Sequence, residues 1–122
     1  MEAELGSLTF PSSWEQVKAT TKSGCVPLGD PYCPSATTYL VTPPDLLDVY
    51  QAARDAVAAN GYEIRDFTPH CEGVPDLPPC SFTAHKNGFT LDLNVYNPGE
   101  DVDKLGISQA NHATIRVIVS RG

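Results

Sequence analysis

The sequence predicts an α+β domain in which one main helix, over about residues 43–59, packs on one face of a four- or five-stranded, mostly antiparallel sheet. Three observations predict this class: a helical apolar period with start and stop signals, an Asn-Gly dipeptide between two alternating segments, and an alternating segment at the end of the chain. Residues 1–36 are expected to form an irregular, disulfide-stapled arm, and residues 37–120 the core. The length of 122 residues suits one domain.

The N-terminal arm shows little periodicity. Residues 8–11 are compatible with a short edge strand, and residues 14–18 with one helical turn in which Trp14 and Val17 share a face. Residues 23–34 are rich in glycine and proline, which predicts a loop.

The main helix follows a short strand over 37–41, which is rich in β-branched and aromatic residues. Thr42 is the expected N-cap, Pro43 suits the first helical position, and Asp45 meets the positive end of the helix. Gly61 follows as the stop signal. The apolar residues that recur at helical spacing are Leu46, Tyr50, Ala53 and Val57.

A β-hairpin gives the clearest local signal. The dipeptide at 87–88 is Asn-Gly, the favoured pair for a two-residue type I′ turn, and alternating segments flank it at 81–86 and 89–96. This turn fixes the register, and one face of the hairpin is then apolar. The expected pairs are Lys86 with Phe89, Ala84 with Leu91, and Phe82 with Leu93.

Two further strands are expected, over 62–67 and 112–120. The second alternates, which predicts one buried and one wet face. Its expected inward residues are Ala113, Ile115, Val117 and Val119, and its outward residues are Thr114, Arg116 and Ile118.

The charge balance excludes some partners. The net charge is −7, and the eight basic residues are scattered singly, whereas nucleic-acid binding needs clustered lysine and arginine. Nucleic acid and anionic lipid surfaces are therefore not expected as partners. No segment approaches the ~20 apolar residues of a transmembrane helix.

The four cysteines form two short-range pairs, Cys25 with Cys33 and Cys71 with Cys80. Their spacings are too wide for a usual zinc site, so disulfides are favoured over metal ligation and over free buried thiols. Disulfides indicate an oxidising compartment. Because residues 1–6 lack the features of a signal peptide, the chain is expected to begin after a removed one, in a secreted or cell-envelope protein.

Candidate catalytic and metal-binding residues are few. His70, His85 and His112 show no short metal-binding spacing, and no serine lies in a Gly-x-Ser-x-Gly motif. Asp101 and Asp103 only echo a calcium loop. No catalytic residue, metal or cofactor is therefore predicted.

Two surfaces are candidates for binding a protein or a glycan. The disulfide-closed loops would lose little entropy on binding, and the polar face of the hairpin is flat and hydrophilic. The candidate residues are Val26, Leu28 and Val74 in the loops, and His85, Thr90 and Asp92 on the polar face.

The segment from Thr42-Pro43-Pro44-Asp45 to Ala59-Asn60-Gly61-Tyr62, followed by a cysteine loop and a hairpin, is similar in layout to small exported bacterial cell-envelope proteins of the lipoprotein type. The lipidated cysteine of such proteins is absent. The function expected from the cysteines and from the lack of catalytic motifs is an extracytoplasmic, non-enzymatic binding or envelope-associated domain of unknown ligand. The alternatives are a small secreted hydrolase that uses a histidine and a carboxylate, and a protein inhibitor or immunity-type module.

Overall fold

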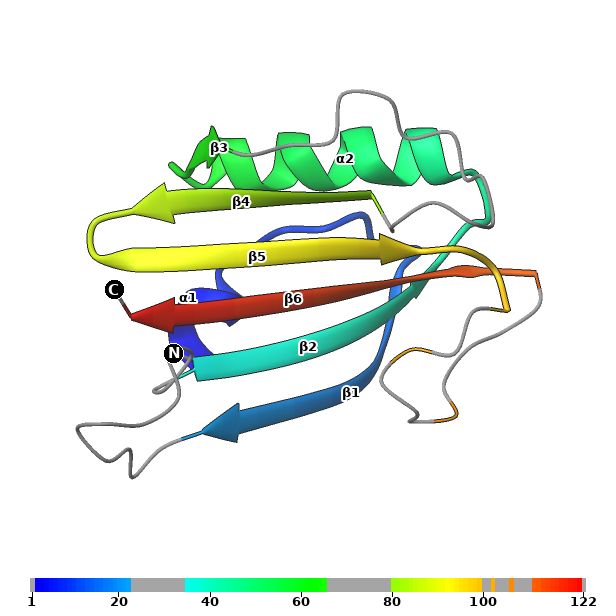
Figure 1. Cartoon of the computed structure of the whole chain (residues 1–122), viewed down its shortest axis with the longest axis horizontal. Coiled ribbons are helices and arrows are strands. Elements are labelled where there is room, and N and C mark those ends of the chain that lie inside the picture. Colours follow the sequence, from blue (N-terminus) through cyan, green and yellow to red (C-terminus); the bar gives the residue numbers. More distant parts are fainter. Residues whose placement is uncertain are drawn as a thin grey trace.

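The computed structural model describes residues 2–22, 35–65, 80–99, 102, 106 and 111–121. Its main feature is a six-stranded antiparallel sheet in the order β1-β2-β6-β5-β4-β3 (Figure 1). The strands are β1 (Glu15–Lys22), β2 (Ser35–Thr42), β3 (Glu63–Arg65), β4 (Cys80–Lys86), β5 (Phe89–Tyr96) and β6 (Ala113–Arg121), and the helices are α1 (Glu2–Gly6) and α2 (Leu46–Ala59).

This architecture corrects the expected fold class. Among the described residues the sheet has six strands instead of four or five, and there are two helices instead of one main helix. The described part of the N-terminal arm, residues 2–22, is not irregular, because it contains α1 and the whole of β1. Only one cysteine, Cys80, lies among the described residues, so no disulfide between described residues holds the arm. Backbone pairing with β2 holds β1 instead.

The path of the chain explains where α2 lies. Because neighbouring strands are antiparallel throughout, β2 and β3 run in the same direction, with β6, β5 and β4 between them. Two parallel strands of one sheet need a crossover connection, which α2 supplies. The helix therefore lies against β3, β4 and β5, while α1 lies against β2 and β6 (Figure 1).

The start of α2 differs from the expected one. Thr42 is the last residue of β2 and is fully buried, and its hydroxyl donates to the carbonyl of Pro43 at 3.0 Å. Asp45 is the N-cap instead, accepting a hydrogen bond from the backbone N–H of Asp48 at 3.3 Å. Gly61 follows the helix with φ of +91°, as the stop signal predicts.

The hairpin prediction is confirmed in full. The pairs Lys86–Phe89, Ala84–Leu91 and Phe82–Leu93 are those the turn chemistry predicts. Asn87 and Gly88 have φ of +42° and +85°, the two left-handed residues of a type I′ turn.

Both helices pack on the same face of the sheet, and one apolar core fills the space between them. The inward residues of β6 are the expected ones. Thr114, expected on the wet face, is only 1% exposed, so that face is also partly covered. Fully buried members of the core include Val57, Phe82, Leu91, Leu93, Ile115 and Val117.

Candidate functional site

A pocket of about 530 Å³ lies between the N-terminal segment and the first two strands. One wall comes from α1 and the connection after it, and the floor comes from β1 and β2. Most of the large side chains that line it are apolar, with polar groups such as Gln16 and Thr21 on β1. The apolar lining includes Leu5, Leu8, Phe10, Trp14, Ala19 and Leu40.

The aromatic part of the wall is built by a turn just before β1. The backbone N–H of Trp14 donates to the carbonyl of Pro11 at 3.0 Å, which brings Trp14 back toward Phe10. Their rings stack with centroids 5.5 Å apart and an interplanar angle of 19°. Trp14 is buried and Phe10 half-buried. The stack therefore presents a fixed aromatic surface to the pocket.

The floor is hollow because its side chains are small. Ala19 on β1 and Ala36 and Thr38 on β2 leave space that neither helix fills, since α2 covers the opposite half of the sheet. The hydroxyl of Thr38 donates to the carbonyl of Lys18 at 3.3 Å, so this polar group is satisfied next to the pocket.

Two expectations for this region are wrong. No strand forms over 8–11, and the residues from Glu15 onward are extended, so Trp14 and Val17 do not share a helical face. Val17 lies where the pairing with β2 shifts register. The pocket was missed because its residues come from separate segments that carry no common sequence pattern.

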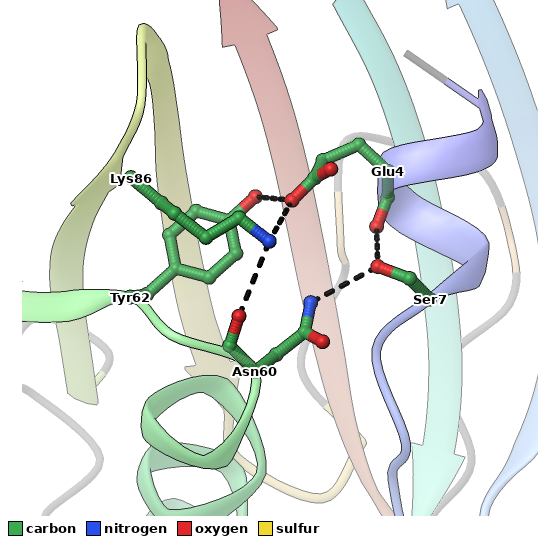
Figure 2. A network of polar contacts seen from close by, with 5 residues as sticks. All are labelled: Glu4, Ser7, Asn60, Tyr62 and Lys86. Atoms are coloured by element: carbon green, nitrogen blue, oxygen red, sulfur yellow. Dashed lines mark hydrogen bonds and ion pairs between the residues drawn. The ribbon is translucent and has the colours of Figure 1, made fainter.

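A cluster of polar contacts holds α1 in place as the wall of the pocket (Figure 2). The ammonium of Lys86 contacts the carboxylate of Glu4 at 2.6 Å, and the hydroxyl of Tyr62 donates to the same oxygen at 2.7 Å. Lys86 also donates to the carbonyl of Asn60 at 3.1 Å, and its ammonium lies 4.8 Å from the centre of the Tyr62 ring. Asn60 donates to the hydroxyl of Ser7, which donates in turn to the carbonyl of Glu4. We call these five residues the N-terminal clasp.

The clasp shifts the titration of two of its members. The hydrogen-bonded Lys86 ammonium holds the pKa of Glu4 below its usual value, and the Tyr62 hydroxyl adds to this effect against the opposing effect of burial. Burial raises the pKa of Tyr62, and its bond to the Glu4 carboxylate raises this pKa further. Glu4 therefore stays charged and Tyr62 stays neutral over the physiological pH range.

The polar face of the hairpin brings together three of the predicted binding residues. His85, Thr90 and Asp92 are half-buried on β4 and β5, and a ring nitrogen of His85 lies 3.5 Å from the hydroxyl of Thr90. Burial raises the pKa of Asp92, and the nearby side chains of Arg116 and His85 oppose this shift.

A second depression, of about 460 Å³, lies beside the hairpin turn. Glu63 and His85 line it and are opposite each other in the β3–β4 register. The Glu63 carboxylate accepts from Arg65 at 3.2 Å, and no hydrogen bond joins His85 to Glu63 or to Asp92. A ring nitrogen of His112 lies 3.1 Å from the carbonyl of Thr42. In the described ranges, His85 and His112 thus have no hydrogen-bonded carboxylate partner.

Several predicted residues lie outside the described part of the chain. The loop residues Val26, Leu28 and Val74 are among them, as are His70 and the three cysteines Cys25, Cys33 and Cys71. The remaining cysteine, Cys80, opens β4, is 5% exposed and is disulfide-bonded. The pairing of the four cysteines stays a prediction.

We expect peptide mapping under non-reducing conditions to recover Cys71 linked to Cys80, and Cys25 linked to Cys33. The residues between the two cysteines of each pair include prolines and favour a short loop. A disulfide within each pair would therefore close a loop that the intervening residues already tend to form. A peptide that links Cys80 to Cys25 or Cys33 would show crossed connectivity instead. Native protein that alkylates at all four thiols would contradict both the bridges and the oxidising compartment.

No cluster of three or more metal-ligating side chains occurs among the residues that the structure describes. Within the same residues, no helix has the length and apolar character to cross a membrane. No family model, curated protein or solved structure matches the chain.

Proposed function

We propose that the chain is an extracytoplasmic, non-catalytic binding domain, and that its site is the pocket between the N-terminal segment and β1–β2. The observation that carries the proposal is a hollow of about 530 Å³ with a stacked aromatic pair in its wall, lined by large apolar side chains and by threonines of β1 and β2. Pockets of this size and lining usually take an apolar ligand or an apolar part of a larger one. The ligand class is therefore a molecule that presents an apolar group.

The wall is ordered before any ligand arrives, which supports this proposal. The N-terminal clasp fixes α1 through half-buried Glu4 and Lys86, and the Phe10–Trp14 stack is held by the turn at Pro11. A preformed wall reduces the entropy lost on binding. The alternative of a hydrolase has weaker support, because His85 makes its described contact to Thr90 and not to a carboxylate.

The experiment uses N-phenyl-1-naphthylamine, an uncharged apolar dye that fluoresces when it leaves water. We expect saturable binding of one dye per chain, together with quenching of Trp14, the only tryptophan of the chain. Phe10→Ala should weaken binding about tenfold, since that corresponds to about 1.4 kcal/mol of lost apolar contact.

Phe89→Ala is the matched control. Phe89 is also half-buried and also packs against the core, but it lies at the hairpin turn, away from the pocket. Its replacement should leave dye affinity unchanged. An equal loss in both variants would show that the dye reports stability and not occupancy of the pocket, and the absence of saturable binding would refute the proposed site.

A further inference from the structure

We infer that the natural ligand is an extended polypeptide segment that pairs with β1 as a seventh strand, with apolar side chains entering the pocket and an acidic side chain beside Lys18. This inference rests on the proposed function and names its ligand class. It follows from the edge position of β1, from the pocket beside it, and from the charge on its other face.

β1 forms one edge of the described sheet. β1 is the first strand in the sheet order, and no described residue pairs with its outer side (Figure 1). The side chains from Lys18 to Thr21 are exposed. Every second residue of an edge strand directs its N–H and C=O groups away from the sheet, and such an edge binds extended peptides by strand addition.

The regular part of this edge has the length of a short strand. The register shift at Val17 acts as a bulge, which by itself protects an edge from pairing. Beyond it, residues 18–22 pair with β2 without interruption, so their outer backbone groups keep a regular spacing. At the opposite edge, the described part of β3 has three residues and offers a shorter template.

The pocket lies on one face of this edge. Ala19 and Thr21 face the pocket, and both are small and exposed. In a strand added to β1, alternate side chains would point to the same face as Ala19, toward the stack of Phe10 and Trp14. Backbone pairing would thus deliver apolar side chains to the pocket.

The other face of the edge carries an exposed lysine, Lys18. Lys18 lies opposite Tyr39 of β2, which lies opposite Arg116 of β6, whose guanidinium lies over the ring of Tyr96. A carboxylate opposite an exposed lysine in a neighbouring strand stabilises the pair. The guest segment is therefore expected to alternate apolar and acidic residues.

A second copy of the chain fits the edge less well. Two copies of β1 would bring together two edges that each carry Lys18 and offer no carboxylate from the regular part of the edge to pair with it. Each copy also carries a net charge of −7. A segment of another protein is the better occupant.

The test uses a blocked synthetic peptide of about six residues, a usual strand length, with alternating leucine and aspartate. At ~0.15 M salt, where charges are screened beyond ~8 Å, the peptide should displace the dye. Two isomers of the peptide distinguish strand pairing from other modes of binding. Each isomer is methylated on every second backbone nitrogen, and the two isomers differ in which set of nitrogens carries the methyl groups. Only the isomer that lacks the N–H groups facing β1 should bind more than tenfold more weakly, because it cannot make the hydrogen bonds that pair the two strands.

A charge reversal tests the orientation. Lys18→Glu should lower the affinity for the aspartate peptide several-fold and raise the affinity for a peptide of alternating leucine and lysine. Arg121→Glu is the control, because it makes the same charge change at an exposed residue of β6, which is not an edge strand. Equal effects of the two variants would mean that Lys18 does not contact the guest.

The outcomes separate this inference from the proposed function. If the dye binds but the peptide does not displace it, or if both methylated isomers bind equally, strand addition is refuted and the apolar pocket stands. If neither dye nor peptide binds, the proposed function fails as well. Loss confined to one methylated isomer, together with the Lys18 reversal, would establish pairing with β1.

Discussion

Leu93→Ala is expected to lower the free energy of unfolding by about 2–5 kcal/mol, as truncations of buried leucines do. Leu93 is fully buried in the centre of β5, opposite Phe82 of β4 and Val117 of β6. Both neighbours are buried strand residues, so the sheet cannot easily close the cavity that the alanine leaves. Urea unfolding followed by circular dichroism measures the change.

Asn94→Ala is the matched control, since it alters the next residue of the same strand. Asn94 is half-buried on the opposite face, between Ser81 of β4 and Arg116 of β6. Its replacement should cost under about 0.5 kcal/mol, as substitutions away from the core usually do. Comparable losses at both positions would mean that the register of the hairpin is shifted by one residue.

The hairpin was predictable because its structure is determined locally. Two adjacent residues, Asn87 and Gly88, tolerate positive φ, and the turn they form decides which side chains face the core. The 14-residue helix α2 was predictable for a similar reason, although its start was not. Thr42 and Asp45 are both competent caps, and pairing with β6 extends β2 through Thr42, so only Asp45 remains to cap the helix.

The first strand of the sheet, β1, could not be predicted in this way. In β1 neither face is packed against the core, so the strand has no apolar alternation to reveal it. Its extended conformation comes from pairing with β2, a long-range contact that local sequence does not encode. The expected helical turn at Trp14 was wrong because tertiary context outweighs a weak local preference.

The candidate site depends on contacts of the same long-range kind. Phe10 and Trp14 meet Ala19 and Leu40 only once the sheet has formed, and a sequence shows no hollow. The N-terminal clasp joins Glu4 of α1 to Lys86 at the end of β4, two elements that lie far apart in the chain. In contrast, the grouping of His85, Thr90 and Asp92 on one face followed directly from the hairpin register.

Tyr62→Phe is expected to lower the free energy of unfolding by about 1–2 kcal/mol. Tyr62 is buried, and its hydroxyl donates to the Glu4 carboxylate at 2.7 Å. Hydrogen bonds to charged groups contribute about 1.5–3 kcal/mol, and the value is reduced here because water still reaches Glu4, which is 17% exposed. Tyr39→Phe removes the same hydroxyl group from a tyrosine of β2. It is a less closely matched control, because Tyr39 lies on the other face of the sheet.

The same clasp predicts how stability depends on pH. The pKa of Glu4 is lowered in the folded state, so the ionised carboxylate stabilises the fold. This contribution to the free energy of unfolding is fully present above about pH 4.3, the usual pKa of glutamate, and is lost as the pH falls toward the pKa of Glu4 in the folded protein. The pKa of Tyr62 is raised on folding, so its contribution is present below about 10 and is lost as the pH rises above that value.

Wild-type protein should therefore lose stability below about pH 4.3, and Glu4→Gln should lack part of this loss. The free energies of unfolding of the two proteins should differ at neutral pH and converge in acid. The measurement is the free energy of unfolding at a series of pH values, because other carboxylates titrate in the same range and only the difference between proteins isolates Glu4.

Glu63→Gln is the control: its ion pair with Arg65 is exposed, with 71% of the Glu63 side chain accessible, and such pairs contribute little. If the Glu4→Gln and Glu63→Gln profiles both ran parallel to the wild type, the Glu4–Lys86 contact would not stabilise the fold. A profile flattened only by Glu4→Gln, together with weaker dye binding at acid pH in the wild type alone, would show that the clasp holds the wall of the pocket.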